Sequence, residues 1–224
     1  MDVRKMRVTP RPRPPRPPGG ERHGGGCMSR LAVADRRALL LAAASRIIAR
    51  DGIAEMTTRA IANEAGMPQG AFHYCFRSKD ELLVELMRAT IDDLVTRSSA
   101  AVTTSTDVHE TIRMSLRGLW QNVVDPADKQ LALYELTTYA LRNPDLGLAE
   151  AQYHGYTLAA TRFLETVAER TLIEWTVPVP TLARLLVSVV DGLGLNWLAD
   201  RDDDAAHAVL DTFARQLTGC AVGR

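Results

Sequence analysis

The sequence predicts an all-α protein, and two observations support this fold class. Apolar residues recur at helical spacing over long stretches, with little of the alternation that β-strands show. Aromatic residues make up only 5% of the 224 residues, which argues against a β-sandwich or barrel. Hydrophobic residues make up 46% of the chain, enough to form a sizeable core in one domain with a small companion.

Four helices are expected in the first part of the chain. They are placed at 34–51, at 58–65, from about 68 through 76, and from 79 to about 98. Gly52 and Gly66 provide the stops of the first two helices. Thr57 is the expected N-cap of the second helix, and Ser78-Lys79-Asp80-Glu81 has the spacing of a capping box at the start of the fourth.

Five further helices are expected after a polar break at 103–107. They are placed at about 107–124, 127–142, 145–175, 180–199 and 204–220. The breaks between them are marked by Asp125-Pro126, Asn143-Pro144, Pro178 to Pro180 and Asp202 to Asp204.

Charge is unevenly distributed, although the chain has 27 basic and 27 acidic residues. Residues 1–30 hold eight basic and two acidic residues, 31–80 hold seven and five, and 81–224 hold twelve and twenty. The front of the chain therefore suits a polyanion, and the back repels one.

Residues 1–30 are expected to form a disordered tail. They contain six of the eleven prolines and five of the fifteen glycines, and such a segment buries too little apolar surface to offset the entropy of ordering. Two interpretations remain open. The tail is either a basic arm that adds phosphate contacts, or a segment without a role, for instance because the start codon is Met28.

The remaining composition favours a soluble cytoplasmic protein. The three cysteines (Cys27, Cys75 and Cys220) cannot all pair with one another and form no C-x-x-C spacing, which fits a reducing cytosol. No uncharged apolar run reaches the ~18 residues that a membrane span needs, and the basic start has no hydrophobic segment behind it. We therefore expect neither export nor a membrane partner.

The stretch Thr57–Lys79 predicts a helix-turn-helix. The small residue Ala62 stands where two helices must cross closely, and Gly66 lies in the turn four positions later. In such a unit the first helix braces the second, whose outer face enters the DNA major groove. Residues 69–76 contain no acid, so nothing on the second helix repels phosphate groups, and Arg77 follows. The alternative is an ordinary αα-hairpin.

This stretch resembles the N-terminal signature of the tetracycline-repressor (TetR) family of bacterial transcription regulators. The resemblance covers residues 34–83 and is carried by Thr57, Ile61, Ala62, Ala65, Gly66, Gly70, Phe72, Phe76, Lys79, Glu81 and Leu82. It implies a helix-turn-helix DNA-binding domain at 31–80 and an effector-binding and dimerisation domain at 81–224. It also implies a homodimer that binds a palindromic operator, usually as a repressor, and releases it when a small-molecule effector binds.

The resemblance further implies which side chains touch DNA. Arg59 and Gln69 are expected to reach base edges, since arginine suits guanine and glutamine suits adenine. Gly70 and Ala71 are short, so the backbone there is expected to approach the bases. The residues expected at the phosphate backbone are Thr58, His73, Tyr74 and Lys79. Two positions depart from the family pattern, with histidine at 73 for the usual tyrosine and proline at 68 for a capping serine or threonine.

Apolar stripes on the last two expected helices predict a dimer interface. The predicted interface residues are Leu182, Leu186, Val189, Val190, Leu193, Val209, Phe213 and Leu217. Two such helices per chain could form a four-helix contact across a twofold axis, as the resemblance implies. The alternative is that both stripes face the monomer's own core.

Ring side chains and a threonine on the middle helices predict an effector pocket. The predicted lining residues are Trp120, Tyr134, Thr138, Tyr139, Tyr153, Tyr156 and Trp197. An apolar cavity with a few polar groups is the usual form of a small-molecule site. The alternative is that these rings are ordinary core residues.

Two other classes of function stay open. A helical adaptor that binds only proteins would share the apolar stripes, but it would have no need for an acid-free helix followed by Arg77 and Lys79. An enzyme is less expected, because His73 and Cys75 lie two positions apart on a helix, diverge by about 200° and cannot form a dyad. The five histidines have no H-x-x-x-H spacing, so neither a metal nor another cofactor is expected.

Overall fold

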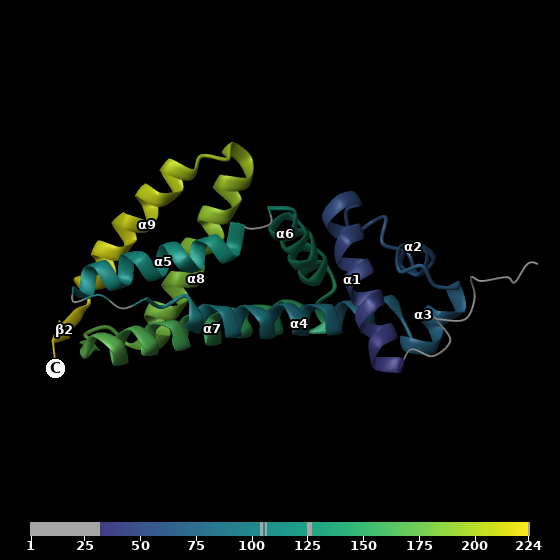
Figure 1. Ribbon diagram of the computed structural model, residues 1–224, viewed down its shortest axis with the longest axis horizontal. Coiled ribbons are helices and arrows are strands. Elements are labelled where there is room, and N and C mark those ends of the chain that lie inside the picture. The colour runs from purple at the N-terminus through teal and green to yellow at the C-terminus, as the bar shows by residue number, and fades with distance from the viewer. Residues whose placement is uncertain (1–31, 104, 106, 125–126, 224) are drawn as a thin grey trace, which may run out of the picture. The chain divides into compact units, whose positions relative to one another are not determined.

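The computed structural model describes residues 32–103, 105, 107–124 and 127–223. These residues contain nine α-helices, one short 3-10 helix and two short strands (Figure 1). The elements are α1 (Val33–Asp51), α2 (Thr58–Glu64), α3 (Gln69–Cys75), α4 (Lys79–Ala100), α5 (Val108–Val124), α6 (Ala127–Arg142), η2 (Pro144–Leu146), α7 (Leu148–Thr171), β1 (Ile173–Trp175), α8 (Val179–Asp200), α9 (Asp203–Thr218) and β2 (Ala221–Gly223). The predicted all-α class is confirmed, while the expected disordered tail at 1–30 and the Asp125-Pro126 break lie outside the described residues.

Local capping fixes the ends of the N-terminal helices as the sequence predicts. The Thr57 side chain accepts a hydrogen bond from the backbone N–H of Ala60 (3.1 Å) at the start of α2. Ser78 Oγ accepts one from the backbone N–H of Glu81 (3.1 Å) at the start of α4. Gly66, in the turn between α2 and α3, has a φ of 68°, which glycine adopts without strain. The predicted helix-turn-helix is therefore formed by α2 and α3.

The N-terminal helices share their hydrophobic core with the rest of the chain. The buried cluster around Phe72 takes side chains from α1, α2, α3 and the start of α4, and it also includes Leu136 and Ala140 of α6. A second cluster is built mainly from α5, α7, α8 and α9. Helix α4 joins the two, since Leu83 belongs to the first cluster and Leu94 packs against the second. The domain division at residue 80 stays a prediction.

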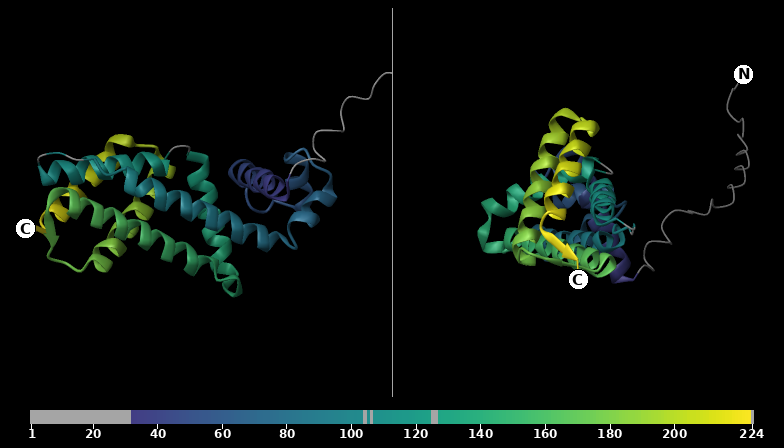
Figure 2. Two further views of the ribbon diagram at one scale, coloured as in Figure 1. Left: turned by 60° about the horizontal axis from the view of Figure 1, so that its bottom comes forward. Right: turned by 90° about the vertical axis from the view of Figure 1, so that its left-hand side faces the viewer.

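Two glycines allow close helix packing in the C-terminal part. Helices α4 and α7 run side by side (Figures 1 and 2). A Cβ on Gly155 of α7 would lie 2.3 Å from Cγ2 of Ile91 on α4, so only glycine permits this approach. A Cβ on Gly194 of α8 would lie 2.5 Å from the hydroxyl of Tyr134 on α6. These contacts bring α4, α6, α7 and α8 together around a common space.

One segment that the sequence assigns to a helix end forms a strand instead. The helix expected over 145–175 ends at Thr171, after which Leu172 has a φ of 55°. The next three residues form β1, which pairs antiparallel with β2, just after the helix expected over 204–220. Three residues are too few to show a strand period, which is why the sequence does not reveal this ribbon.

Five of the residues predicted for the dimer interface lie in the monomer's own core. They are Leu182, Leu186, Leu193, Phe213 and Leu217, each at most 7% exposed. A side chain enclosed by its own chain offers little surface to a partner, so these five favour the alternative, that the stripes face the monomer's own core. Val189 and Val190 are half-buried, and Val209 is 44% exposed. The apolar stripe in the sequence is therefore mainly the inward face of α8 and α9.

Candidate DNA-binding surface and ligand cavity

The outward face of α3 presents polar groups to solvent. Gln69, Gly70, His73 and Tyr74 are all exposed, whereas Phe72 on the opposite face is fully buried. The helix contains no acidic residue, and nothing charged on it opposes an approaching phosphate. A helix fixed along one face and polar on the other is the arrangement that major-groove reading requires.

The other predicted DNA contacts surround this face with different degrees of exposure. Arg59 on α2 is exposed, while Thr58 and Ala71 are half-buried. The guanidinium of Arg36 on α1 lies 5.7 Å from the centre of the Tyr74 ring, which is 66% exposed. Arg36, which is not among the DNA contacts expected from the sequence, therefore adds a positive charge beside α3.

The ammonium of Lys79, which was expected to contact a DNA phosphate, is instead engaged within the protein. Its Nζ donates a hydrogen bond to the carbonyl oxygen of Ile53 (3.2 Å), in the turn between α1 and α2. The ammonium also lies 5.8 Å from the centre of the Tyr139 ring on α6. Burial lowers the pKa of Lys79 below its ordinary value. These contacts make Lys79 a tether of the α1–α2 turn.

Arg37 on α1 clamps the end of α3. Its guanidinium donates to the carbonyl oxygen of Cys75, the last residue of α3, and to the carboxylates of Glu81 (3.4 Å) and Glu85 on α4. It also lies 4.2 Å from the centre of the Phe76 ring. The hydrogen bond to Glu85 raises the pKa of Arg37 above its ordinary value. The sequence does not single out Arg37, because one arginine on an amphipathic helix produces no periodic signal.

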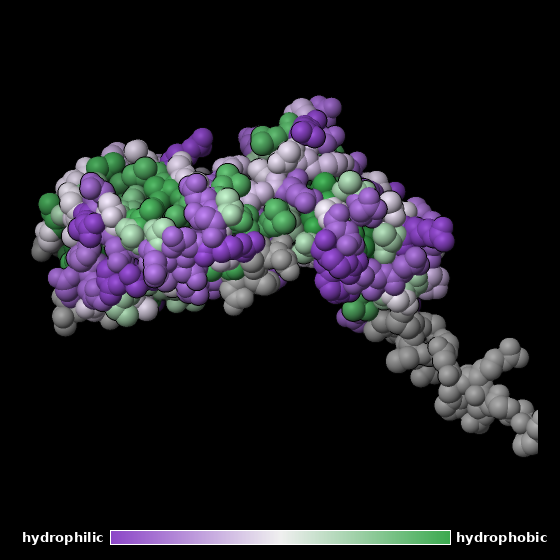
Figure 3. Space-filling model, turned by 90° about the horizontal axis from the view of Figure 1, so that it is seen from above, coloured by the Kyte–Doolittle hydropathy of each residue, from purple (hydrophilic) through white to green (hydrophobic). Residues whose placement is uncertain are grey.

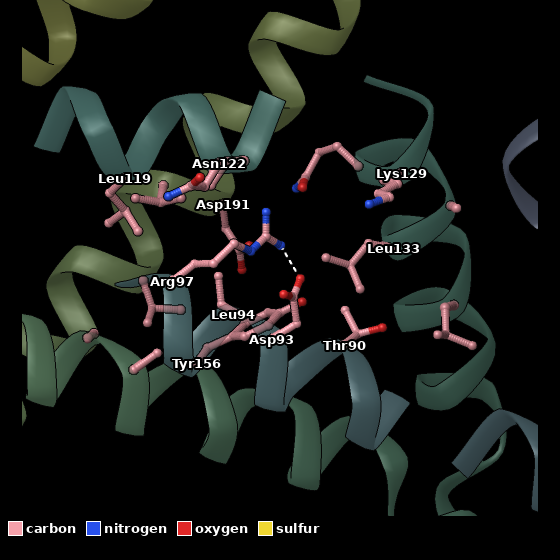
Figure 4. Close-up of a pocket in the computed structure, with 18 of the residues that line it drawn as sticks. Thr90, Asp93, Leu94, Arg97, Leu119, Asn122, Lys129, Leu133, Tyr156 and Asp191 are labelled. Atoms are coloured by element: carbon pink, nitrogen blue, oxygen red, sulfur yellow. Dashed lines mark hydrogen bonds and ion pairs between the residues drawn. The ribbon is translucent and has the colours of Figure 1, made fainter. Parts of the chain in front are cut away.

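A cavity of about 320 Å³ lies among α1, α4, α5, α6, α7 and α8 (Figure 4). Most of its wall is apolar, with leucine, valine and alanine side chains and the ring of Phe163. Its polar lining residues are Ser45, Thr90, Asp93, Arg97, Asn122, Lys129, Gln130, Tyr156 and Asp191. An apolar wall with a few polar groups is the usual form of a small-molecule site.

Two carboxylates in the cavity have different partners. Asp93 forms an ion pair with Arg97 one turn along α4. Asp191 on α8 accepts a hydrogen bond at Oδ2 from the hydroxyl of Tyr153 (2.8 Å). Burial raises the pKa of Asp191 above its ordinary value, and burial together with this hydrogen bond raises the pKa of Tyr153 to about 12.

Of the seven residues predicted to line the pocket, Tyr156 alone lies in the wall of this cavity. Its hydroxyl accepts a hydrogen bond from Nε2 of Gln152 (2.7 Å), and burial raises its pKa. The structure places Trp120, Tyr134, Thr138, Tyr139, Tyr153 and Trp197 outside the lining.

Those six residues have structural surroundings of their own. Trp120 and Trp197 pack edge to face in the core, with ring centres 6.2 Å apart. The hydroxyl of Tyr139 donates to Asp80 (3.0 Å), and Thr138 is exposed. Tyr134 and Tyr153 contact the cavity indirectly, because both donate hydrogen bonds to Asp191. The helical spacing of the rings in the sequence thus mainly reflects core packing. Tyr134 and Tyr153 lie behind the cavity wall, where they bind Asp191.

Helix α6 connects the cavity with the DNA-binding helices. Leu133 and Leu136 of α6 line the cavity, as does Ile48 of α1. The carboxylate of Glu135, also on α6, accepts a hydrogen bond from the backbone N–H of Ile53 (2.6 Å) in the α1–α2 turn. A displacement of α6 by a ligand would therefore act directly on the turn that precedes α2.

The outward faces of α8 and α9 carry exposed apolar side chains. Leu185 and Leu195 on α8 are 46% and 55% exposed, and Val209 on α9 is also exposed. Figure 3 shows hydrophobic side chains gathered over the end of the protein where Figure 1 places these helices. Helix α8 is also the one described helix that is long and apolar enough, by length and composition alone, to cross a membrane, and about a third of that window is buried. Exposed apolar faces of this kind mark contact surfaces.

The sequence matches the family described as "Bacterial regulatory proteins, tetR family" over residues 40–86. The nicotine-responsive transcriptional repressor HdnoR of Paenarthrobacter nicotinovorans is 33% identical over 185 residues, which are 82% of this chain and 94% of that repressor. The chain belongs to the TetR family. It is therefore a DNA-binding transcriptional regulator and not an enzyme, as the sequence predicts.

Two solved structures share the fold. A transcriptional regulator of Streptomyces coelicolor A3(2) has a TM-score of 0.63 at 26% identity, over 82% of this chain and 99% of that one. The multidrug binding protein EbrR, solved in complex with imidazole, has a TM-score of 0.57 at 29% identity, over 78% of this chain and 92% of that one. TetR-family regulators bind operator DNA and small-molecule effectors, typically as dimers.

The Arg37 clamp generates a prediction for DNA affinity. Arg37→Met keeps most of the side-chain volume but removes the bonds to Cys75 and the α4 carboxylates. We expect ~1–3 kcal/mol weaker binding to a duplex selected from a random pool, because α3 loses a charge-assisted anchor. Fluorescence anisotropy measures the affinity, and circular dichroism checks the fold. The matched control is Arg46→Met, whose exposed ion pair with Glu64 should matter little. Equal DNA affinities of Arg37→Met and Arg46→Met would contradict the claim that Arg37 anchors α3.

Proposed function

We propose that this regulator represses transcription as a homodimer on a palindromic operator in the cytoplasm, and that a small molecule bound in the cavity releases it. The observation that carries the proposal is the acid-free, polar outer face of α3, fixed from behind by a core that includes helices of the cavity wall. The name of HdnoR, a nicotine-responsive repressor, supports both the sign of regulation and the small-molecule effector.

In the proposed complex, the start of α3 reads the bases. Gln69 is the first residue of α3 and is exposed, so its amide can reach adenine, while Arg59 can reach guanine. Gly70 and Ala71 allow the backbone to approach the groove. Thr58, His73 and Tyr74 hold phosphates. Lys79 acts indirectly, by holding the α1–α2 turn.

The outward faces of α8 and α9 form the proposed dimer contact. Leu185 and Leu195 lie ten residues apart on one face of α8, with the exposed Gly192 between them, and Val209 extends the apolar surface onto α9. Two helices from each protomer then form a four-helix contact across a twofold axis. In such a dimer, the two α3 helices can enter successive major grooves. Their separation is then about 34 Å, or a multiple of that distance.

The effector is proposed to act by selecting a dimer geometry that no longer fits this spacing. The cavity wall includes α1, α4 and α6, which also build the core behind α3. For a near-complete switch, the ligand must bind the released geometry about 5 kcal/mol more tightly than the DNA-bound one. A confirmed cavity ligand that leaves operator affinity unchanged would refute the switch.

The base-reading role predicts a specificity change. Gln69→Ala or Arg59→Ala should lose ~1–3 kcal/mol of discrimination at one base pair per half-site, because each removes a side chain that distinguishes one base from the others. Binding of each variant to the selected duplex and to single-base variants of it measures this loss. Equal losses on selected and random DNA would mean that these side chains contact only phosphates.

The dimer proposal predicts a change in oligomeric state. Leu195→Glu places a charge in the centre of the proposed contact and should weaken dimerisation on the order of a hundredfold or more. Sedimentation equilibrium measures the dissociation constant. Leu141→Glu on α6, where the leucine is 63% exposed, makes the same substitution outside the proposed contact and should leave the dimer intact. A Leu195→Glu protein that remains as dimeric as this control would rule out the α8 contact.

A further inference from the structure

We propose that the cavity is built for a small amphipathic cation, whose ammonium group binds the carboxylate of Asp191. This inference rests on the proposed function, because it names the chemical class of the effector. It concerns the charge and size of the ligand, which the DNA-binding role does not specify.

Asp191 is a carboxylate without a countercharge at the cavity wall. It lies in the middle of α8 and accepts one side-chain hydrogen bond, from the hydroxyl of Tyr153 (2.8 Å). Its backbone carbonyl accepts a second bond, from the hydroxyl of Tyr134 (2.8 Å). Among the residues that the structure describes, no lysine, arginine or histidine nitrogen forms an ion pair with it. An ionised carboxylate offers about four acceptor sites, so positions remain for a ligand donor.

The other charges in the wall leave Asp191 as the unbalanced one. Asp93 and Arg97 on α4 neutralise each other in an ion pair, and Figure 4 shows this pair and Asp191 of α8 at the same cavity. Lys129 is exposed and is therefore hydrated by solvent. Asp191 is half-buried, so water compensates its charge less well. The cavity thus favours a positive group near α8.

The raised pKa of Asp191 agrees with this geometry. Burial makes the ionised form costly, and the Tyr153 hydrogen bond offsets only part of that cost. An ammonium group within hydrogen-bond distance would stabilise the ionised carboxylate and would itself be stabilised. Binding of a cation therefore relieves an unfavourable feature of the free protein.

The apolar lining of the cavity suits the apolar part of such a ligand. Tyr156 presents its ring at the cavity, held by Gln152 and by edge contact with Tyr153 at 5.6 Å between ring centres. Ring faces attract cations and pack against hydrocarbon. Phe163 and several leucines complete an apolar wall, and the volume of about 320 Å³ limits the ligand to a small molecule.

The test uses three probes with one phenylpropyl skeleton and different charges. They are 3-phenylpropylamine (cation), 3-phenylpropan-1-ol (neutral) and 3-phenylpropionate (anion), titrated calorimetrically into the full-length protein at neutral pH. We expect the amine to bind on the order of tenfold or more tightly than the alcohol, and more tightly still than the propionate. Operator release is measured separately by adding each probe to the protein–DNA complex.

Three variants assign the preference to Asp191. Asp191→Asn keeps the shape but removes the charge and should abolish the preference for the amine over the alcohol. Asp191→Glu keeps the charge and should retain part of that preference. Asp92→Asn removes an equal charge from an exposed site on α4 outside the cavity wall and should bind all three probes as the native protein does.

Several results would overturn the proposal. They are an alcohol or propionate that binds as tightly as the amine, an amine preference that persists in Asp191→Asn, and no amine binding at concentrations up to ~10 mM. Tighter binding of the propionate would indicate that Arg97 or Lys129 selects the ligand instead. If the amine binds through Asp191 but does not release DNA, the proposed effector role fails while the cation site stands.

Discussion

The core that α3 shares with α4 and α6 is the constraint on which the rest of the structure depends. Phe72 on the inner face of the recognition helix belongs to the same buried cluster as Leu83 of α4 and Leu136 of α6. Fully burying each such side chain contributes roughly 1.5–3 kcal/mol, so α3 cannot leave these helices without a large cost. The position of the DNA-reading face is therefore set by helices that also enclose the cavity.

Helix α8 takes part in both the cavity wall and the proposed dimer contact. Asp191 points to the cavity, whereas the neighbouring Gly192 is exposed on the proposed dimer face together with Leu195. The close approach of Tyr134 at Gly194 fixes α8 against α6. A ligand held by Asp191 would thus contact the helix that is proposed to set the spacing of the two protomers and, through α6, the turn before α2.

The sequence predicted the local features of the DNA-binding region well, because they depend on near neighbours. Thr57 and Ser78 cap their helices as expected, and Gly66 has the positive φ that its turn requires. Helical periodicity did not predict whether an apolar helix face packs against the monomer's own core or against a partner. Leu186 and Phe213 showed helical spacing, but spacing cannot tell the monomer's own core from a partner.

The cavity was harder to predict because its polar groups come from distant parts of the chain. The aromatic residues that the sequence suggested are mostly packed in the core, and Asp191 was overlooked. A signal for it was present, since Asp191 is the sole charged residue in the mainly apolar stretch 185–199. The clamp formed by Arg37 had no comparable signal, because it depends on where α3 ends in space.

Operator affinity of a Glu135→Ala variant tests the coupling through α6 most directly. This substitution leaves the backbone N–H of Ile53 without its acceptor, so the α1–α2 turn must be ordered when DNA binds. We expect an affinity for the selected duplex lower by about threefold to thirtyfold, with unchanged helix content, whereas Thr138→Ala on the exposed face of α6 should bind normally. Equal affinity of the Glu135→Ala and native proteins would contradict the claim that α6 holds the DNA-binding helices in place.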